Sequence, residues 1–221
     1  MADKFAVIGL GQFGSAICRK LSEKGADVLE IDIDEDKVEA IKDYVAYAVR
    51  MDATDEGALR AQKVQDMDAV VVSIGQNFEG TMLTVVKLME IGVQRLIGRA
   101  QGDTQRSILE KLGVEEILSP EEEVGNNMAE RLMHPSYNMC IELPDNYEIV
   151  EVEAPSTLVG RGLEDIDLAG KYHLNLVTVI KETGGEKHVV DLRSDLVIEE
   201  GDEIVVFGLI KNVERFIDIN K

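Results

Sequence analysis

The sequence predicts an α/β protein: a Rossmann-like, doubly wound parallel sheet followed by a second, smaller α+β domain. Three observations predict it. Short β-branched runs alternate with helical periods over the first 134 residues, which is typical of βαβ units. Three glycines separate the first of these runs from the first helical segment. After residue 134 the strand-like runs are no longer separated by long helical segments, so we predict domains 1–134 and 135–221.

The elements of the first domain follow from this alternation. We expect strands at 4–9, 27–32, 44–49, 69–74, 95–100 and 115–119, and helices at 12–24, 35–42, 55–63, 78–91, 103–112 and 121–133. The run AVVVSI at 69–74 is apolar at nearly every position, as expected of a central strand covered on both faces. In the helix at 78–91 we expect an apolar face to pack on the sheet, formed by Met82, Val85, Val86 and Met89.

The second domain has shorter elements. HPSYN at 134–138 ends the last helix of the first domain. We then expect strands at 139–144, 148–154, 174–182, 187–192 and 202–208, with a single helix at 163–173. TGGEK at 183–187 predicts a hairpin turn.

Composition excludes several classes of protein. Lys and Arg number 23 and Asp and Glu 43, a net charge of −20, which argues against nucleic acid and against an anionic membrane surface as partners. The two cysteines, Cys18 and Cys140, have no CxxC spacing, so a reduced cytosolic setting fits best. The apolar runs are too short to span a bilayer, and MADKF at the N-terminus shows no secretory signal. We therefore expect a soluble protein.

The glycines Gly9, Gly11 and Gly14 form a G-x-G-x-x-G motif between a predicted strand and a predicted helix, the context that gives this motif its meaning. Gly9 permits a tight turn, Gly11 lets a pyrophosphate approach the backbone, and Gly14 allows close packing of helix on strand. The free N–H groups at the start of the helix then face the phosphates. The alternative is a turn required by packing, without a ligand.

An acid follows at the end of the next predicted strand. Asp32 lies 18 residues beyond Gly14, where a carboxylate accepts hydrogen bonds from ribose hydroxyls and repels a 2′-phosphate. This favours NAD, ATP or ADP over NADP. We interpret Asp34 as the N-cap of the helix that follows.

Two further strand ends are expected at the same cleft, because ligands of such sheets bind at the carboxyl ends of the strands. Residues 52–54 would meet the base, and residues 73–75 would pass close to the sugar and phosphates. The alternatives are that Asp52 or Thr54 only caps the helix near Asp55, and that Asn77 only caps the next helix. The full candidate set for the cofactor is Gly9, Gly11, Gln12, Phe13, Gly14, Asp32, Ile33, Lys37, Asp52, Ala53, Thr54, Ser73, Ile74, Gly75, Asn77 and Arg99.

Arg99 ends the fifth predicted strand and would point toward the phosphates, although a lone Arg is more often a solvated charge. Three glutamates open the last helix of the first domain, which the helix dipole alone favours. The sharper hypothesis is that Glu121 helps a phosphate to hold a divalent cation.

The sequence lacks the residues of an enzyme of this fold. None of its three histidines, His134, His173 and His188, lies at a predicted strand end of the cleft. No Tyr-x-x-x-Lys pair and no GxxxxGK[ST] loop is present. We therefore interpret the ligand as an effector. The alternative is a small NAD-dependent oxidoreductase with an unidentified substrate, which hydride-transfer assays would reveal.

These residues resemble the cytosolic gating subunits of Ktr and Trk potassium uptake systems, the RCK or KTN proteins. The resemblance is carried by FAVIGLGQFG, EIDIDEDKV, DAT, VVSIG, RAQ and LSPEEEVG, in this order, and covers nearly the whole chain. It implies a Rossmann N-lobe whose last helix is a dimer hinge, and a small C-lobe. It also implies homodimers that assemble into a homo-octameric ring beneath a membrane-embedded potassium channel subunit, hence a cytoplasmic protein peripheral to the membrane.

The resemblance also implies ligands. Nucleotides, ATP, ADP, NAD or NADH, would bind the N-lobes at the candidate set, with Arg99 as the basic phosphate position and Glu121 as the glutamate that binds Mg²⁺ or another divalent cation. Members that prefer ATP carry Arg where this chain has Gln12. The missing charge favours NAD(H) or ADP here. In some relatives the C-lobe binds cyclic di-AMP, for which this sequence shows no specific motif.

Overall fold

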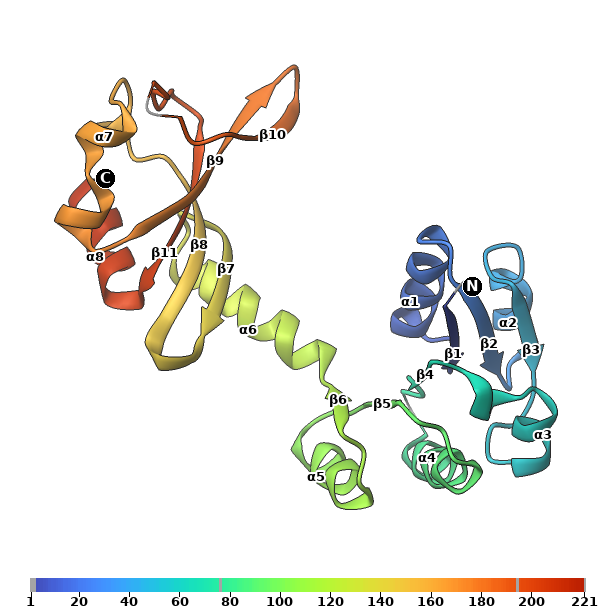
Figure 1. The fold of residues 1–221 in the computed structure, drawn as a ribbon. Helices are drawn as coiled ribbons and strands as arrows, with labels where there is room; N and C mark the ends of the chain where they lie inside the picture. The colour runs from blue at the N-terminus through green and yellow to red at the C-terminus, as the bar shows by residue number, and fades with distance from the viewer. Residues whose placement is uncertain (1–2, 76, 194, 221) are drawn as a thin grey trace. The chain divides into compact units, whose positions relative to one another are not determined.

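The computed structural model describes residues 3–75, 77–193 and 195–220. The chain divides into two compact units, residues 1–123 and 124–221 (Figure 1). The division falls inside helix α6 (Pro120–Met133), whereas the sequence predicts a boundary after this helix, at residue 134. No residue of α6 is buried, so the helix adds little to the packing of either unit.

The first unit contains a six-stranded parallel sheet in the order β3-β2-β1-β4-β5-β6. Its strands are β1 (Lys4–Ile8), β2 (Asp27–Asp32), β3 (Tyr47–Arg50), β4 (Ala69–Val72), β5 (Leu96–Arg99) and β6 (Glu116–Leu118). This confirms the doubly wound fold class. The order reverses between β1 and β4, and a crevice forms at the carboxyl ends of strands where that happens.

Five helices connect these strands: α1 (Gln12–Glu23), α2 (Glu35–Ile41), α3 (Glu56–Ala61), α4 (Phe78–Ile91) and α5 (Asp103–Leu112). A 3-10 turn covers Val64–Asp66. The side chains of Asp34, Asp55 and Asn77 accept backbone N–H bonds at the starts of α2, α3 and α4, which satisfies donors that a helix leaves unpaired. The prediction that Asp34 is an N-cap is confirmed.

Apolar cores cover both faces of the sheet. On one face Cys18 of α1 and Ile41 of α2 pack with Val7 and Val28. On the other face, side chains of α3, α4 and α5 pack with alternate residues of the strands, among them Leu59, Leu88, Leu109 and Ile8. All four residues of β4 are buried, as predicted for the central strand.

Several bounds in the first unit differ from prediction, and for two elements the local cause is evident. The third strand begins at Tyr47 rather than at residue 44, because Tyr44 donates its N–H to the carbonyl of Ile41 in a turn. Helix α3 is shorter than 55–63, because Asp55 is its N-cap and Lys63 has a left-handed backbone with φ of 56°.

The second unit is an antiparallel sheet in the order β10-β9-β11-β8-β7. The strands are β7 (Tyr137–Leu143), β8 (Tyr147–Glu153), β9 (Asn175–Thr183), β10 (Glu186–Val190) and β11 (Glu203–Leu209). Gly184 and Gly185 have positive φ between β9 and β10, so the predicted hairpin is confirmed. Short 3-10 turns cover Pro144–Asn146 and Ser156–Leu158.

The helices of the second unit correct two predictions. The segment predicted as one helix at 163–173 is α7 (Leu163–Ile166) and a π-helical turn at Leu168–Tyr172. Asp167 separates them with φ of 51°, a left-handed value that no helix continues. Helix α8 (Ile210–Asn220) was not predicted. Its Val213, Phe216 and Ile217 are buried in the core of this unit.

No helix in the described part of the chain is both long and apolar enough to cross a membrane.

Candidate functional site

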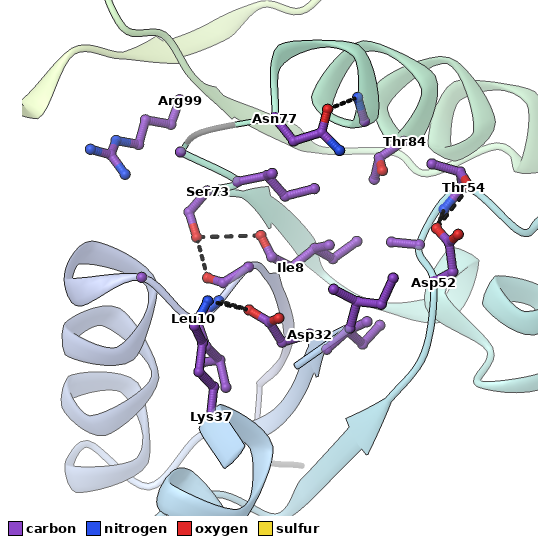
Figure 2. Close-up of a pocket in the computed structure, with 18 of the residues that line it drawn as sticks. Ile8, Leu10, Asp32, Lys37, Asp52, Thr54, Ser73, Asn77, Thr84 and Arg99 are labelled. Carbon is purple, nitrogen blue, oxygen red and sulfur yellow. Dashed lines mark hydrogen bonds and ion pairs between the residues drawn. The ribbon is translucent and has the colours of Figure 1, made fainter. Parts of the chain in front are cut away.

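A cavity of about 730 Å³ lies at the carboxyl ends of the first unit's strands (Figure 2), a volume typical of small-molecule sites. The structure brings fifteen of the sixteen cofactor candidates to its wall. They are Gly9, Gly11, Gln12, Phe13, Asp32, Ile33, Lys37, Asp52, Ala53, Thr54, Ser73, Ile74, Gly75, Asn77 and Arg99. Gly14 is not part of this wall.

Each glycine of the motif is needed for a different reason. Gly9 has φ of +100°, and a Cβ there would lie 2.9 Å from the backbone nitrogen of Ile74. A Cβ at Gly14 would lie 2.0 Å from the carbonyl oxygen of Gly9 and 2.5 Å from Ser73 Oγ. A Cβ at Gly11 would meet no atom within 4 Å. Packing therefore requires Gly9 and Gly14, whereas Gly11 borders open space in the cavity.

The N-terminus of α1 is left without a side-chain cap, unlike those of α2, α3 and α4. Its N-cap is Gly11, no side chain bonds to its first turn, and that turn carries no acidic residue. Gln12 and Phe13, the first two helical residues, line the cavity. Unpaired backbone N–H groups and the helix dipole make such an end suitable for a phosphate group.

Asp32 fastens the glycine loop and remains available to a ligand. Its Oδ2 accepts the Leu10 N–H at 2.6 Å and its Oδ1 accepts the Asp34 N–H at 2.9 Å. The Lys37 ammonium lies 3.9 Å from Oδ2. Because each carboxylate oxygen has two lone pairs, Asp32 can still accept ribose hydroxyls. The ligand role was predicted from the sequence, whereas the structural role was not.

Ser73 and Asn77 use their side chains within the protein. Ser73 Oγ lies 2.6 Å from the carbonyl oxygen of Gly9, to which it donates. Asn77 Oδ1 accepts the Gly80 N–H at 2.9 Å. The capping alternative for Asn77 is therefore what the structure shows, and both residues also line the cavity.

Asp52 closes a turn after β3. Its Oδ1 accepts the backbone N–H of Thr54 at 2.9 Å and the Thr54 hydroxyl at 2.7 Å, and these bonds hold the pKa of the Asp52 carboxyl below its usual value. Asp55 caps α3, so the alternative that Asp52 or Thr54 is the cap is wrong.

Arg99 and Glu121 form an ion pair at the edge of the site. Arg99 donates from Nη2 to Glu121 Oε1, and its guanidinium carbon lies 5.5 Å from the centre of the Phe13 ring. Its Nε is buried without a partner among the described residues. The pKa of Glu121 is held below its usual value, first by a hydrogen bond from its own backbone N–H and then by Arg99. Glu121 does not line the cavity.

Nine described residues of the wall were not predicted: Ile8, Leu10, Ile31, Met51, Glu79, Gly80, Leu83, Thr84 and Gln101. Four of them, Ile8, Leu10, Ile31 and Met51, stand next to a candidate residue in the chain. Gly80 and Thr84 follow Asn77 at helical spacing on α4, and this periodicity would have identified them.

The charges of the wall limit its chemistry. The described wall carries two cations, Lys37 and Arg99, and three carboxylates, Asp32, Asp52 and Glu79. It contains hydroxyl and amide side chains, and its described residues include neither histidine nor cysteine. Such a wall can bind a polar ligand through hydrogen bonds and charge.

Comparisons with known proteins agree on one family. Residues 5–120 match the TrkA-N domain and residues 147–221 the TrkA-C domain. Ktr system potassium uptake protein C of Bacillus subtilis is 36% identical over 216 residues, which cover 98% of this chain and 96% of that protein. Ktr system potassium uptake protein A of Vibrio alginolyticus is 30% identical over 205 residues, 93% of this chain and 92% of that protein.

A solved structure of the GsuK channel bound to NAD has the same fold. It matches with a TM-score of 0.66 and 13% identity, over 96% of this chain and 38% of that one. This chain thus spans less than half of the GsuK chain.

Proposed function

Because the chain belongs to the TrkA-N and TrkA-C family of Ktr and Trk potassium uptake proteins, we propose that it is a nucleotide-binding regulatory subunit of a potassium transport system. The observation that carries the proposal is the cavity itself. An uncapped helix start, an open space beside Gly11 and the carboxylate of Asp32 border one cavity at the switch point of the sheet. The helix start and the open space beside Gly11 suit a diphosphate, and the carboxylate of Asp32 suits a ribose.

The ligand we propose is NAD(H) or ADP, in preference to ATP. Gln12 contributes no charge at the start of α1, and the described wall has three carboxylates for two cations. A third phosphate would add negative charge without a new cation to balance it. The NAD bound by the GsuK channel, which has the same fold, supports this class of ligand.

A divalent cation would need oxygens from the ligand. The described residues include no group of three or more His, Cys, Asp or Glu side chains that could hold a metal ion, and Glu121 bonds to Arg99. Glu121 would therefore hold Mg²⁺ only together with phosphate oxygens, an arrangement that suits this ion. Cyclic di-AMP at the C-terminal unit stays an expectation from the resemblance.

The partner we propose is a membrane-embedded potassium transport subunit, with this chain on its cytoplasmic side and not acting as an enzyme. Regulation then requires that the nucleotide bind one shape of the assembly more tightly than another. A ligand with equal affinity for both shapes does not change the equilibrium between them. Turnover of NADH with any metabolite would instead favour the oxidoreductase alternative.

Replacing Asp32 with alanine is expected to weaken ADP binding roughly 10- to 100-fold, because hydrogen bonds to a charged group contribute about 1.5–3 kcal/mol. Calorimetric titration measures this loss. Asp34→Ala is the matched control: it removes the same charge two residues away, from an N-cap outside the cavity. It should cost about 1 kcal/mol of stability and leave ADP affinity unchanged. Equal losses in both variants would contradict the site.

Assembly is the second testable part of the proposal. Val124, Met128 and Leu132 repeat every four residues along α6, and they are 65%, 48% and 73% exposed. An apolar stripe of this kind suits burial against a second copy of the chain, as in the dimers and octameric ring that the resemblance implies.

Leu132→Asp is therefore expected to lower the mass of the assembly measured by light scattering, because it places a charge in the stripe. Asn126→Asp on α6 adds the same charge outside the stripe and should leave the mass unchanged. A wild-type protein that is monomeric at all concentrations would contradict the proposed assembly.

A further inference from the structure

The hydroxyl group of Thr84 has no hydrogen-bond partner in the described part of the chain. The side chain is fully buried on α4, and Oγ1 makes no hydrogen bond with any described residue. Thr84 nevertheless lines the cavity (Figure 2). Buried hydroxyls are nearly always hydrogen-bonded, so an exception requires an explanation.

The helix offers the usual solution, and Thr84 does not use it. A threonine in a helix commonly donates to the carbonyl three or four residues earlier. Thr81, one turn before, does so: its Oγ1 lies 2.9 Å from the Asn77 carbonyl oxygen and 3.2 Å from that of Ile74. The two threonines of α4 thus differ: Thr81 is hydrogen-bonded, whereas Thr84, on the cavity wall, finds no partner within the described ranges.

The cavity that Thr84 lines has apolar parts that suit a flat heterocycle. Ile8, Ile31 and Ala53 are buried side chains that line the same cavity. Gly80, one turn before Thr84, also lines it and adds no side chain. Figure 2 shows Thr84 on the same side of the cavity as Asp52 and Thr54, and α4 packs against α3, the helix that follows those residues.

The rest of the site indicates which part of the nucleotide would lie near Thr84. With a diphosphate at α1 and a ribose at Asp32, the base lies beyond Asp32, toward the loop 52–54 that follows β3. A purine has apolar faces and ring nitrogens that accept hydrogen bonds. We infer that Thr84 is a specificity-determining residue whose hydroxyl donates to a ring nitrogen of the bound purine. This inference rests on the proposed function.

Thr84→Val tests it, because valine has the same shape and no hydroxyl. Two effects of opposite sign are expected. Without ligand, the variant should melt at a higher temperature than the wild type, because an unsatisfied buried hydroxyl has been removed. Its dissociation constant for ADP, measured by calorimetry, should rise about three- to tenfold, the value of one neutral hydrogen bond. Thr84→Ser keeps the hydroxyl and should bind ADP as the wild type does.

A series of ADP analogues identifies the acceptor. The 1-, 3- and 7-deaza analogues each replace one ring nitrogen by CH. One of these analogues should bind the wild type more weakly than ADP does. Thr84→Val should bind that analogue no more weakly than the wild type binds it, because the analogue and the variant each remove the same hydrogen bond. Equal losses for all three in both proteins would overturn the inference.

The outcomes separate this inference from the proposed function. If the wild type binds ADP and Thr84→Val binds it equally well, the inference is wrong and the proposed function stands. If Thr84→Val lowers the melting temperature of the free protein, the hydroxyl has a partner within the protein and the inference is wrong. If the wild type binds neither ADP nor NAD, both are wrong.

Discussion

Gly14→Ala is expected to destabilise the first unit by about 3 kcal/mol, the upper end of the cost of overpacking, and to abolish ADP binding. The added methyl carbon would lie 2.0 Å from the carbonyl oxygen of Gly9 and 2.5 Å from Ser73 Oγ. Neither neighbour can yield, because one is backbone and the other donates its hydrogen bond to that carbonyl. Helix α1 must therefore move away from the loop.

Gly11→Ala is the matched control, since it adds the same methyl group three residues earlier. The backbone of Gly11 has φ of −71° and ψ of −178°, which alanine adopts freely, and its Cβ would meet no atom within 4 Å. We expect less than about 1 kcal/mol of lost stability but weaker ADP binding, because the methyl group borders the diphosphate position. Urea denaturation and calorimetry measure the two effects. Equal destabilisation by both variants would contradict this assignment.

Glu30 is expected to make stability depend strongly on pH. It lies in β2 with no exposed surface, and both carboxylate oxygens lack partners among the described residues. Burial, and secondarily the charge of Asp32, raise its pKa from 4.5 to about 8. The folded protein keeps this proton while the unfolded chain loses it above about pH 4.5. Stability should therefore fall between about pH 4.5 and pH 8, by on the order of 3–5 kcal/mol.

Glu30→Met tests this expectation, because it keeps the length of the side chain and removes the charge. The free energy of unfolding, measured in urea from about pH 5 to pH 9, should lose this slope. At pH 8 the variant should exceed the wild type by about 2–4 kcal/mol. Glu35→Gln, which replaces an exposed glutamate, should change neither the slope with pH nor the free energy of unfolding at pH 8. A wild-type profile that is flat over this range would show that Glu30 has a partner or reaches water.

The glycine loop and Asp32 could be predicted from the sequence because their requirements are local. A strand, three spaced glycines, a helix and an acid at the next strand end specify one geometry. Asp32 also has a structural role, because it accepts the Leu10 N–H. This role could not be predicted, because it depends on how close the glycine loop lies to the end of β2 in the folded protein.

Other features depend on contacts that the sequence pattern does not specify. In α4 the predicted apolar face included Met82 and Met89, but Met89 is 40% exposed and the buried positions are Gly80, Thr81, Thr84, Val85, Leu88 and Ile91. At Gly80 a Cβ would lie 2.6 Å from the side-chain nitrogen of Asn77, the residue that caps the helix, so no larger residue fits there. Glu30 interrupts a buried strand and has no partner among the residues that the structure describes, which no propensity predicts.

The second unit was predicted less completely in two places. The left-handed backbone of Asp167 breaks a segment whose residues otherwise favour a helix, and the side chain of Asp167 accepts the Gly170 N–H at 3.0 Å to begin the turn that follows. Helix α8 did carry a signal, since Val213, Phe216, Ile217 and Asn220 have helical spacing and are all buried.

A crystal structure of the protein grown with saturating ADP would show where the nucleotide binds. We expect the diphosphate against the backbone N–H groups of Gln12 and Phe13, beside Gly11, with both ribose hydroxyls donating to Asp32. Density for ADP elsewhere on the chain, with this crevice empty, would contradict it.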